Sequence, residues 1–167
     1  NNFYRDEAEK QEALRNKTAP DHPTIYFKKT TLATGPDGEV PSYPEYAPEL
    51  DYEPGVLLIT NADIMQIPEK DAGKYIFGYT ILGIVISRGV TVRHRRPMVA
   101  SSLDGFAPMG PWIVTADELG ENPVFEIESK INGKTVQKCT TDLMKFTPNF
   151  VVSDLSAYSI LKAASLI

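Results

Sequence analysis

The stretch from Leu103 to Glu118 constrains the fold more than any other part of the chain, because it combines rigid and small residues in close order. Pro108 and Pro111 fix their own φ angles, and Gly110 between them permits a close approach of two backbone segments. The residues Trp112–Val114 follow and predict an apolar strand. The stretch therefore predicts a stiff, wall-like turn. Packing alone and a direct role in binding both stay open for it.

The composition is that of one ordinary domain. The chain has 167 residues, of which 42% are hydrophobic, and this predicts a single domain over residues 1–167. A formal net charge of −5 argues against a nucleic-acid partner, because phosphate contacts need clustered Lys and Arg. The basic cluster Arg93–Arg96 is short and predicts a solvated loop, although a carboxylate or phosphate ligand there stays open.

The sequence predicts no membrane span, because no window approaches the roughly twenty apolar residues that a spanning helix needs. The longest mostly apolar stretch, Tyr75–Ser87, is interrupted by Gly78 and Gly83 and predicts a buried strand. Cys139 is the only cysteine, so no intrachain disulfide can form. This pattern is typical of a reducing intracellular compartment. The cytoplasm and the mitochondrion both stay open.

Residues 1–50 predict a surface helix followed by a proline-rich segment. Good helix formers with few apolar residues occupy Tyr4–Asn16. The Pro-Asp-Gly sequence at Pro36–Gly38 predicts a turn between two extended pieces. Ile25–Phe27 and Val40 are the expected strand contacts in these pieces.

Residues 51–167 are expected to form the core, mostly from strands. A β-branched and leucine run predicts a strand at Val56–Thr60. Asn132-Gly133 lies between two extended runs, which is the strongest short signal for a β-hairpin.

Short helices are expected between these strands. One begins at Pro68 and runs to Lys74, with acidic residues in its first turn. Thr115, followed by Glu118, forms a capping box that predicts the start of another. The last is expected to be capped by Ser153. The fold class predicted from this pattern is mainly β with short helices.

Several short blocks occur in the order that a known family shows. They are Phe27-Lys28, Leu50–Glu53, Phe77–Thr80, Ser101–Phe106, Asn132-Gly133 and the spaced residues Gln137, Thr141, Met144 and Phe146. With these blocks the chain resembles the fumarylacetoacetate hydrolase family. The resemblance implies a roll of packed mixed β-sheets. Because the family's later Gly-Asp and Thr-Gly-Thr-Pro blocks have no counterpart, it also implies a degenerate member that is C-terminally shortened, or a fragment.

For an intact member the resemblance implies hydrolysis, decarboxylation or isomerisation of a small oxo-acid, with Mg²⁺ or Mn²⁺ chelating the substrate. These ions need hard oxygen ligands. Glu53 matches the first ligand position, but Gly55 and Ile84 stand where the other two carboxylates are expected. Glu53 is therefore interpreted as a relic of the metal site. No cofactor is expected, and Mg²⁺ or Mn²⁺ only if the site has been rebuilt.

The catalytic side chains that the resemblance implies are also replaced. Glu7 stands where the family has a water-activating His, and Ser101 stands where it has a Lys. The block Arg88–Thr91 has lost an acid and an amide. The remaining catalytic candidates are Glu7, Arg88 and Asp104.

The resemblance further implies five residues that line a substrate pocket. They are Phe106, Pro108, Gly110, Tyr79 and Gln137. Other chemistries lack support, because His22, His94 and Cys139 have no spacing typical of a zinc site.

These observations favour a pseudoenzyme that serves as a structural or regulatory subunit, with other protein chains as partners in a homo- or hetero-oligomer. The alternative is a hydrolase, decarboxylase or tautomerase of a small oxo-acid with a rebuilt, metal-poor active site. A small-molecule sensor that uses the vacated pocket is a third hypothesis.

Overall fold

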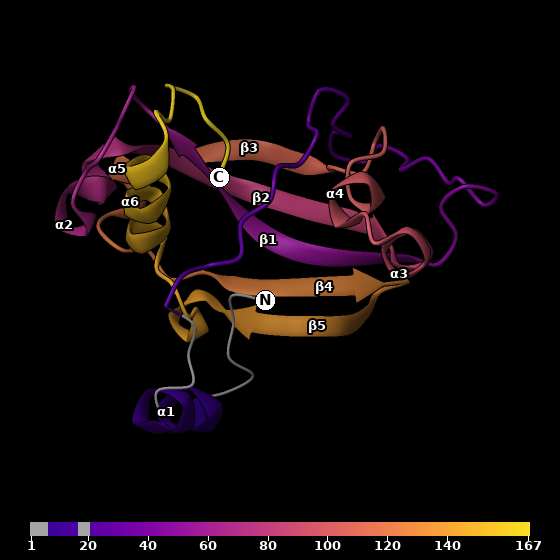
Figure 1. Ribbon diagram of the computed structural model, residues 1–167, viewed down its shortest axis with the longest axis horizontal. Helices are drawn as coiled ribbons and strands as arrows, with labels where there is room; N and C mark the ends of the chain where they lie inside the picture. Colours follow the sequence, from indigo (N-terminus) through magenta and orange to yellow (C-terminus); the bar gives the residue numbers. More distant parts are fainter. Residues whose placement is uncertain (1–6, 17–20) are drawn as a thin grey trace. The chain divides into compact units, whose positions relative to one another are not determined.

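The computed structural model describes residues 7–16 and 21–167 (Figure 1). The fold is mainly β with short helices, which confirms the predicted fold class. The chain forms two compact units. The first combines the N-terminal segment up to Thr24 with Leu58–Tyr79 and Val114–Ile167, and the second combines Ile25–Leu57 with Thr80–Ile113. The single domain expected over residues 1–167 stays a prediction.

Three strands form one sheet in the order β1-β2-β3. They are β1 (Leu50–Thr60), β2 (Ile76–Ser87) and β3 (Met109–Thr115). The four residues from Leu57 to Thr60 are buried, as their β-branched and leucine side chains require. The strands expected at Val56–Thr60, within Tyr75–Ser87 and at Trp112–Val114 are thus confirmed.

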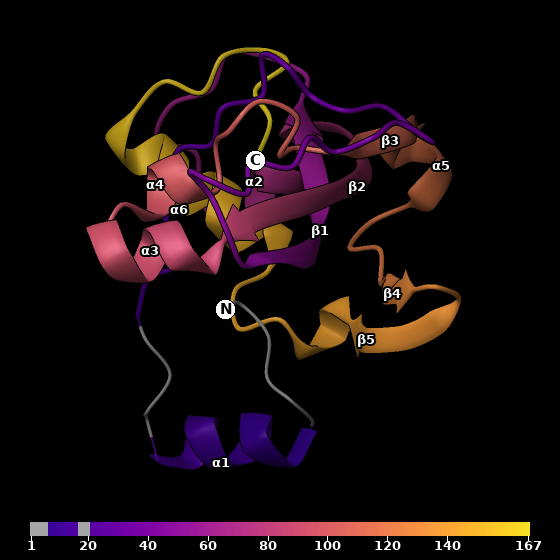
Figure 2. The same ribbon diagram turned by 90° about the vertical axis from the view of Figure 1, so that its right-hand side faces the viewer.

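Two short helices follow β2 in the second unit: α3 (Arg88–His94) and α4 (Pro97–Ala100) lie side by side (Figures 1 and 2). Their buried Val90 and Ala100 pack with Ala47 and Ile86 in one apolar cluster. The solvated loop expected at Arg93–Arg96 is present only at the exposed Arg95 and Arg96, because the chain stays helical through His94. It stops at Arg95, whose φ of 50° is left-handed.

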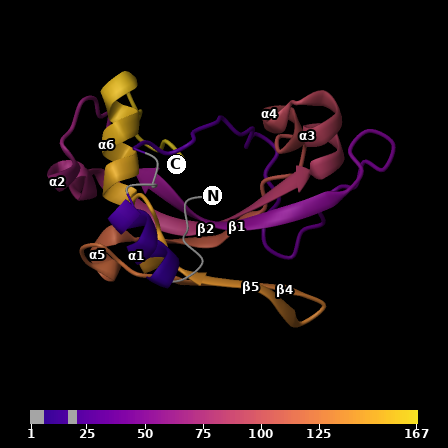
Figure 3. The same cartoon turned by 60° about the horizontal axis from the view of Figure 1, so that its bottom comes forward.

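The first unit contains the remaining helices. They are α1 (Glu7–Asn16), α2 (Glu69–Ala72) with the following 3₁₀ turn η1 (Gly73–Tyr75), α5 (Ala116–Leu119), η2 (Thr141–Leu143) and α6 (Pro148–Tyr158). Helix α2 packs against α6 (Figures 1 and 3). At the chain's end, Ile167 pairs with Leu58 of β1 through two backbone hydrogen bonds of 2.8 and 2.9 Å. No helix in the described ranges has the length and apolar content to span a bilayer.

The predicted hairpin is present and is formed by β4 (Glu126–Ile131) and β5 (Lys134–Thr140), which pair antiparallel (Figure 3). Asn132 and Gly133 have φ angles of 50° and 77°. Both residues of a type I′ turn need positive φ, which explains the Asn-Gly pair.

The proline-rich segment differs from expectation, because Ile25–Phe27 and Val40 lie outside any strand. The segment instead contacts the 101–109 loop through single backbone bonds, from Gly105 N–H to Leu32 O and from Met109 N–H to Thr34 O. Prolines lack an N–H and cannot continue a ladder, so isolated bonds replace a strand pair. The turn at Pro36–Gly38 is confirmed by the bond from Gly38 N–H to Gly35 O.

One helix start and one helix cap differ from expectation. Helix α6 begins at Pro148, capped by Thr147, whose hydroxyl accepts the Phe150 N–H at 3.0 Å. Ser153 lies inside this helix and donates to Ile67 O, so it is not the cap that was expected. Thr115 precedes α5 as predicted, but its side chain makes no capping bond to a backbone N–H.

The capping bond predicts a measurable contribution to stability. Replacing Thr147→Ala should lower the free energy of unfolding by about 1 kcal/mol, because one N–H at the start of α6 loses its acceptor. Urea unfolding followed by circular dichroism measures the change. Thr147→Ser keeps the hydroxyl and should behave as the unmodified chain. Equal stability of the alanine variant would contradict the assignment of this cap.

Candidate functional site

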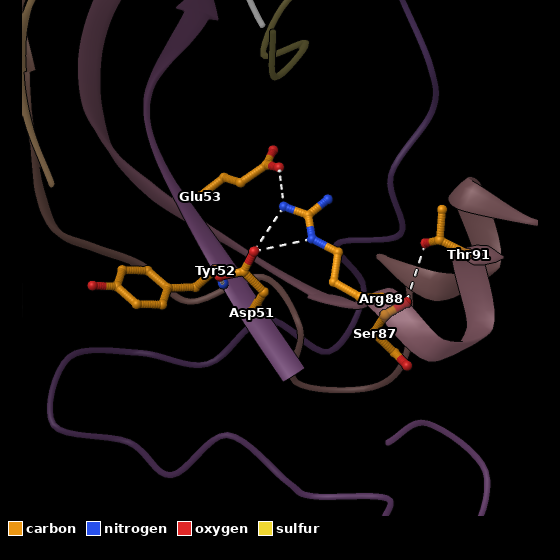
Figure 4. Close-up of polar contacts among 6 residues, drawn as sticks. All are labelled: Asp51, Tyr52, Glu53, Ser87, Arg88 and Thr91. Atoms are coloured by element: carbon orange, nitrogen blue, oxygen red, sulfur yellow. Dashed lines mark hydrogen bonds and ion pairs between the residues drawn. The ribbon is translucent and has the colours of Figure 1, made fainter. Parts of the chain in front are cut away.

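The relic ligand Glu53 takes part in an ion-pair cluster within the second unit (Figure 4). The Arg88 guanidinium donates from Nε and Nη2 to Asp51 Oδ2 at 3.0 and 2.8 Å. The same Nη2 donates to Glu53 Oε1 at 2.8 Å. One guanidinium thus holds both carboxylates of β1, and all three side chains are about half exposed.

The backbone on either side fixes the position of Arg88. Ser87 is fully buried, caps α3 by accepting the Val90 N–H, and donates its hydroxyl to Pro48 O at 2.6 Å. The Arg88 N–H donates to Glu49 O. A Cβ at Gly89 would come within 3.1 Å of the Pro48 ring, so a larger residue there would require Pro48 to shift. Gly89, at the position where the resemblance implies an acid, therefore packs closely against Pro48.

Electrostatics stabilises the charged form of each partner. The hydrogen bond from Arg88 holds the pKa of Asp51 below its usual value, and the backbone N–H of Tyr52 adds to this. The hydrogen bonds to Asp51 and Glu53 raise the pKa of Arg88. Burial and the negative charge of Glu53 raise the pKa of Tyr26, which shows that this phenol lies near the cluster.

The three positions at which the resemblance implies metal ligands do not offer a divalent ion a set of oxygen ligands. Gly55 and Ile84 offer no side-chain oxygen, and the Glu53 carboxylate is already paired with Arg88. Asp51, a possible substitute ligand, is paired with the same arginine. Among the residues that the structure describes, no group of three His, Cys, Asp or Glu side chains is placed to hold a metal ion.

Two neighbouring lysines contact the loop that begins at Ser101. The Lys28 ammonium donates to the backbone carbonyl of Ser101, the position at which the resemblance places the family's lysine. Lys29 forms an ion pair with Asp104, one of the catalytic candidates. Burial lowers the pKa of Lys28 to about 8, because desolvation penalises the charged amine.

The 103–118 stretch forms the wall that its prolines and glycines predict. Phe106 is fully buried and packs edge-on against Tyr43, with ring centroids 5.9 Å apart. Pro108 O accepts the Gly83 N–H of β2 at 2.8 Å, and a Cβ at Gly83 would meet the proline ring at 2.9 Å. Gly110 has a φ of 117°. These contacts are packing contacts, and a binding role for the stretch stays a prediction.

The predicted site residues fall into two groups. Arg88, Asp104, Phe106, Pro108 and Gly110 belong to the second unit, whereas Tyr79 and Gln137 belong to the first. Tyr79 is buried and packs against Phe125, with ring centroids 5.3 Å apart, and Gln137 is exposed on β5. Glu7 begins α1, but its side chain lies outside the described part of the chain. The roles of these residues stay predictions.

Sequence reasoning missed Lys28 and Tyr26 as members of the site. Lys28 stood in a recognised block, Phe27-Lys28, but served there only to identify the family. The available signal was the pair of adjacent lysines in a proline-rich segment. Nothing in the sequence distinguishes the buried one from Lys29, which is exposed and ion-paired.

Comparisons with known proteins agree with the block pattern. The family model described as fumarylacetoacetate (FAA) hydrolase C-terminal matches residues 2–167. The chain is 30% identical over 148 residues to oxaloacetate tautomerase YisK of Bacillus subtilis, covering 89% of this chain and 49% of that protein. The chain thus spans about half the length of the curated relatives that it matches.

Solved structures give the same result. A fumarylacetoacetate hydrolase from Exiguobacterium antarcticum superposes with a TM-score of 0.89 at 25% identity, covering 99% of this chain and 58% of that one. A 5-carboxymethyl-2-hydroxymuconate delta-isomerase from Mycobacterium smegmatis gives a TM-score of 0.79 at 31% identity, covering 89% and 58%. The chain therefore belongs to the fumarylacetoacetate hydrolase family.

Proposed function

We propose that this domain has lost the metal-dependent chemistry of its family and serves as a structural or regulatory part of a larger assembly. The observation that carries the proposal is the pairing of Glu53 with Arg88, while Gly55 and Ile84 occupy the other two ligand positions. A metal ion would have to displace the guanidinium and would then meet a single inherited carboxylate. One carboxylate holds Mg²⁺ or Mn²⁺ only weakly.

Charge balance supports the proposal. The inherited site requires three carboxylates and a divalent ion, and two of the three carboxylates are replaced by uncharged residues. The absence of these two carboxylates removes two negative charges, and the absence of the divalent ion removes two positive charges. The local net charge is therefore unchanged. Arg88 pairs with Glu53, the one ligand carboxylate that remains, and with the neighbouring Asp51. The cluster therefore needs no ion to avoid an unpaired repulsion between its carboxylates.

Metal titration tests the loss of the site. The unmodified chain should bind Mn²⁺ weakly, and the double variant Gly55→Glu, Ile84→Asp should bind it about tenfold more tightly or better, because oxygen ligands return. A Cβ at Gly55 meets only Leu82 O at 3.6 Å, so the first substitution fits. Electron paramagnetic resonance of free Mn²⁺ measures the affinity, and circular dichroism checks folding.

The matched control is Gly55→Gln, Ile84→Asn, which keeps the shapes without the charges and should bind no better than the unmodified chain. Tight Mn²⁺ binding by the unmodified chain would contradict the proposal.

Exposed aromatic side chains favour an assembly role. In the second unit Phe27, Tyr46 and Trp112 are 86%, 78% and 70% exposed. Among the strands of the described residues, β3, which carries Trp112, lies at one edge of the three-stranded sheet. Exposed apolar side chains and an open strand edge favour association with another chain.

Sedimentation velocity over a range of concentrations tests this second part of the proposal. The chain should associate with itself, or remain soluble only with a partner, because association buries these side chains. A folded chain that sediments as a monomer at every concentration, with a sharp thermal transition, would contradict an assembly role.

A second candidate function is tautomerisation of a small oxo-acid without a metal, and the relative that is an oxaloacetate tautomerase favours it. The candidates Arg88 and Asp104 are both ion-paired, with Asp51 and Lys29 respectively. If the chain is a catalyst, enol and keto oxaloacetate should interconvert faster with the chain than without it. Ultraviolet absorbance in the presence of a chelator measures this rate. Arg88→Met should then abolish the effect. An unchanged rate with the chain present would exclude this candidate.

A further inference from the structure

Lys28 differs from the adjacent Lys29 in what it contacts. Its ammonium donates to a neutral group, the backbone carbonyl of Ser101, and the side chain is half buried. Lys29, the next residue, is exposed and neutralised by Asp104. Within the described ranges no carboxylate forms an ion pair with Lys28. A carbonyl dipole stabilises an ammonium less than a carboxylate does, so this amine loses its proton more readily.

Burial acts in the same direction, since it lowers the pKa of Lys28 to about 8. About a tenth of such an amine is neutral at pH 7, against roughly 0.03% for an ordinary lysine. The neutral amine is the nucleophile that attacks carbonyl compounds.

The neighbours of Lys28 include a polar hydrogen that is available to a ligand. Ser102 accepts the Lys29 N–H at its Oγ, at 3.2 Å. Its own hydroxyl hydrogen has no acceptor among the residues that the structure describes. Ser102 follows directly on the residue whose carbonyl Lys28 contacts, and a serine hydroxyl can donate a hydrogen bond to a carboxylate. Tyr26, two residues before Lys28, lies near the Glu53 and Arg88 charges.

We propose that Lys28 is a covalent capture site for small 2-oxo acids, which it binds as a Schiff base, with Ser102 holding the acid's carboxylate. The geometry that carries this is the amine on the Ser101 carbonyl beside the free Ser102 hydroxyl hydrogen.

The chemistry needs no metal and no redox partner. The lone pair of the neutral amine forms a bond to the keto carbon, and the electrons of the C=O bond move to oxygen, which takes up a proton. The nitrogen of the resulting carbinolamine passes one proton to the hydroxyl oxygen, which leaves as water while the nitrogen lone pair forms the C=N bond. The product is a protonated imine, and hydrolysis reverses each step. Ser102 positions the acid and exchanges no proton with it.

This inference goes beyond the proposed function and does not depend on it. The metal titration reports on Glu53, Gly55 and Ile84, whereas imine formation reports on Lys28. A chain that bound Mn²⁺ tightly could still form the imine, and a chain that formed no imine could still lack the metal. The two outcomes are therefore distinguishable.

Trapping with borohydride tests the proposal on the whole chain. Pyruvate, the probe, is incubated with the chain at neutral pH, and sodium borohydride then transfers a hydride to the imine carbon, which leaves a stable secondary amine. Peptide mapping by mass spectrometry locates the adduct. Lys28 should carry at least about ten times more adduct than the mean of the other lysines, because more of its amine is neutral.

The controls separate capture from surface labelling. Lactate has no keto group and should leave no adduct, and Lys29→Gln should keep the labelling at Lys28. Ser102→Ala should reduce it several-fold, and Lys28→Met should abolish the selective adduct with unchanged circular dichroism. The position of the adduct in the unmodified chain tests the proposal even if a variant does not fold. No adduct at Lys28, or equal adducts on Lys28 and Lys29, would overturn the proposal.

Discussion

The ion pairs of Arg88 with Asp51 and Glu53 join the start of β1 to the start of α3, and the candidate site depends on them. A divalent ion at the position that the resemblance implies would bind carboxylates of both β1 and β2. The Arg88 guanidinium instead holds Asp51 and Glu53 together through directional hydrogen bonds, since its planar group can bind two carboxylates at once. All three side chains are half exposed, so the cluster contributes little to stability. Its consequence is chemical, because it pairs Glu53, the one carboxylate at the ligand positions that the resemblance implies.

The wall formed by the 103–118 stretch shows which contacts restrict substitution in the backbone framework. Gly83 of β2 and Pro108 are in such close contact that a Cβ at the glycine would require the proline ring to move. Gly105, at a φ of 78°, is equally restricted by Pro41. Substitution at such glycines disturbs backbone packing, which favours their retention wherever the fold is retained.

Short-range signals in the sequence predicted their elements well. Asn132-Gly133 specifies its turn because both residues must take positive φ, and this needs no information from elsewhere in the chain. The start of α6 was misplaced because Thr147 and Ser153 are both good caps. Tertiary contacts decide between them, since Ser153 Oγ donates to Ile67 O instead. Ile25–Phe27 has strand-like residues, but no neighbouring strand with which to pair.

The candidate site was predictable only where it depends on residue identity. The absence of oxygen ligands at Gly55 and Ile84 follows from the sequence and the resemblance. The contact between Lys28 and Ser101 joins residues 73 positions apart, and no local pattern specifies it. That contact changes where reactivity is to be expected. Arg88 and Asp104 are each neutralised by a partner of opposite charge, which lowers their value in proton transfer. Within the described part of the chain Lys28 contacts a carbonyl and forms no ion pair, and burial lowers its pKa to about 8, so the reactive group that we propose is this amine.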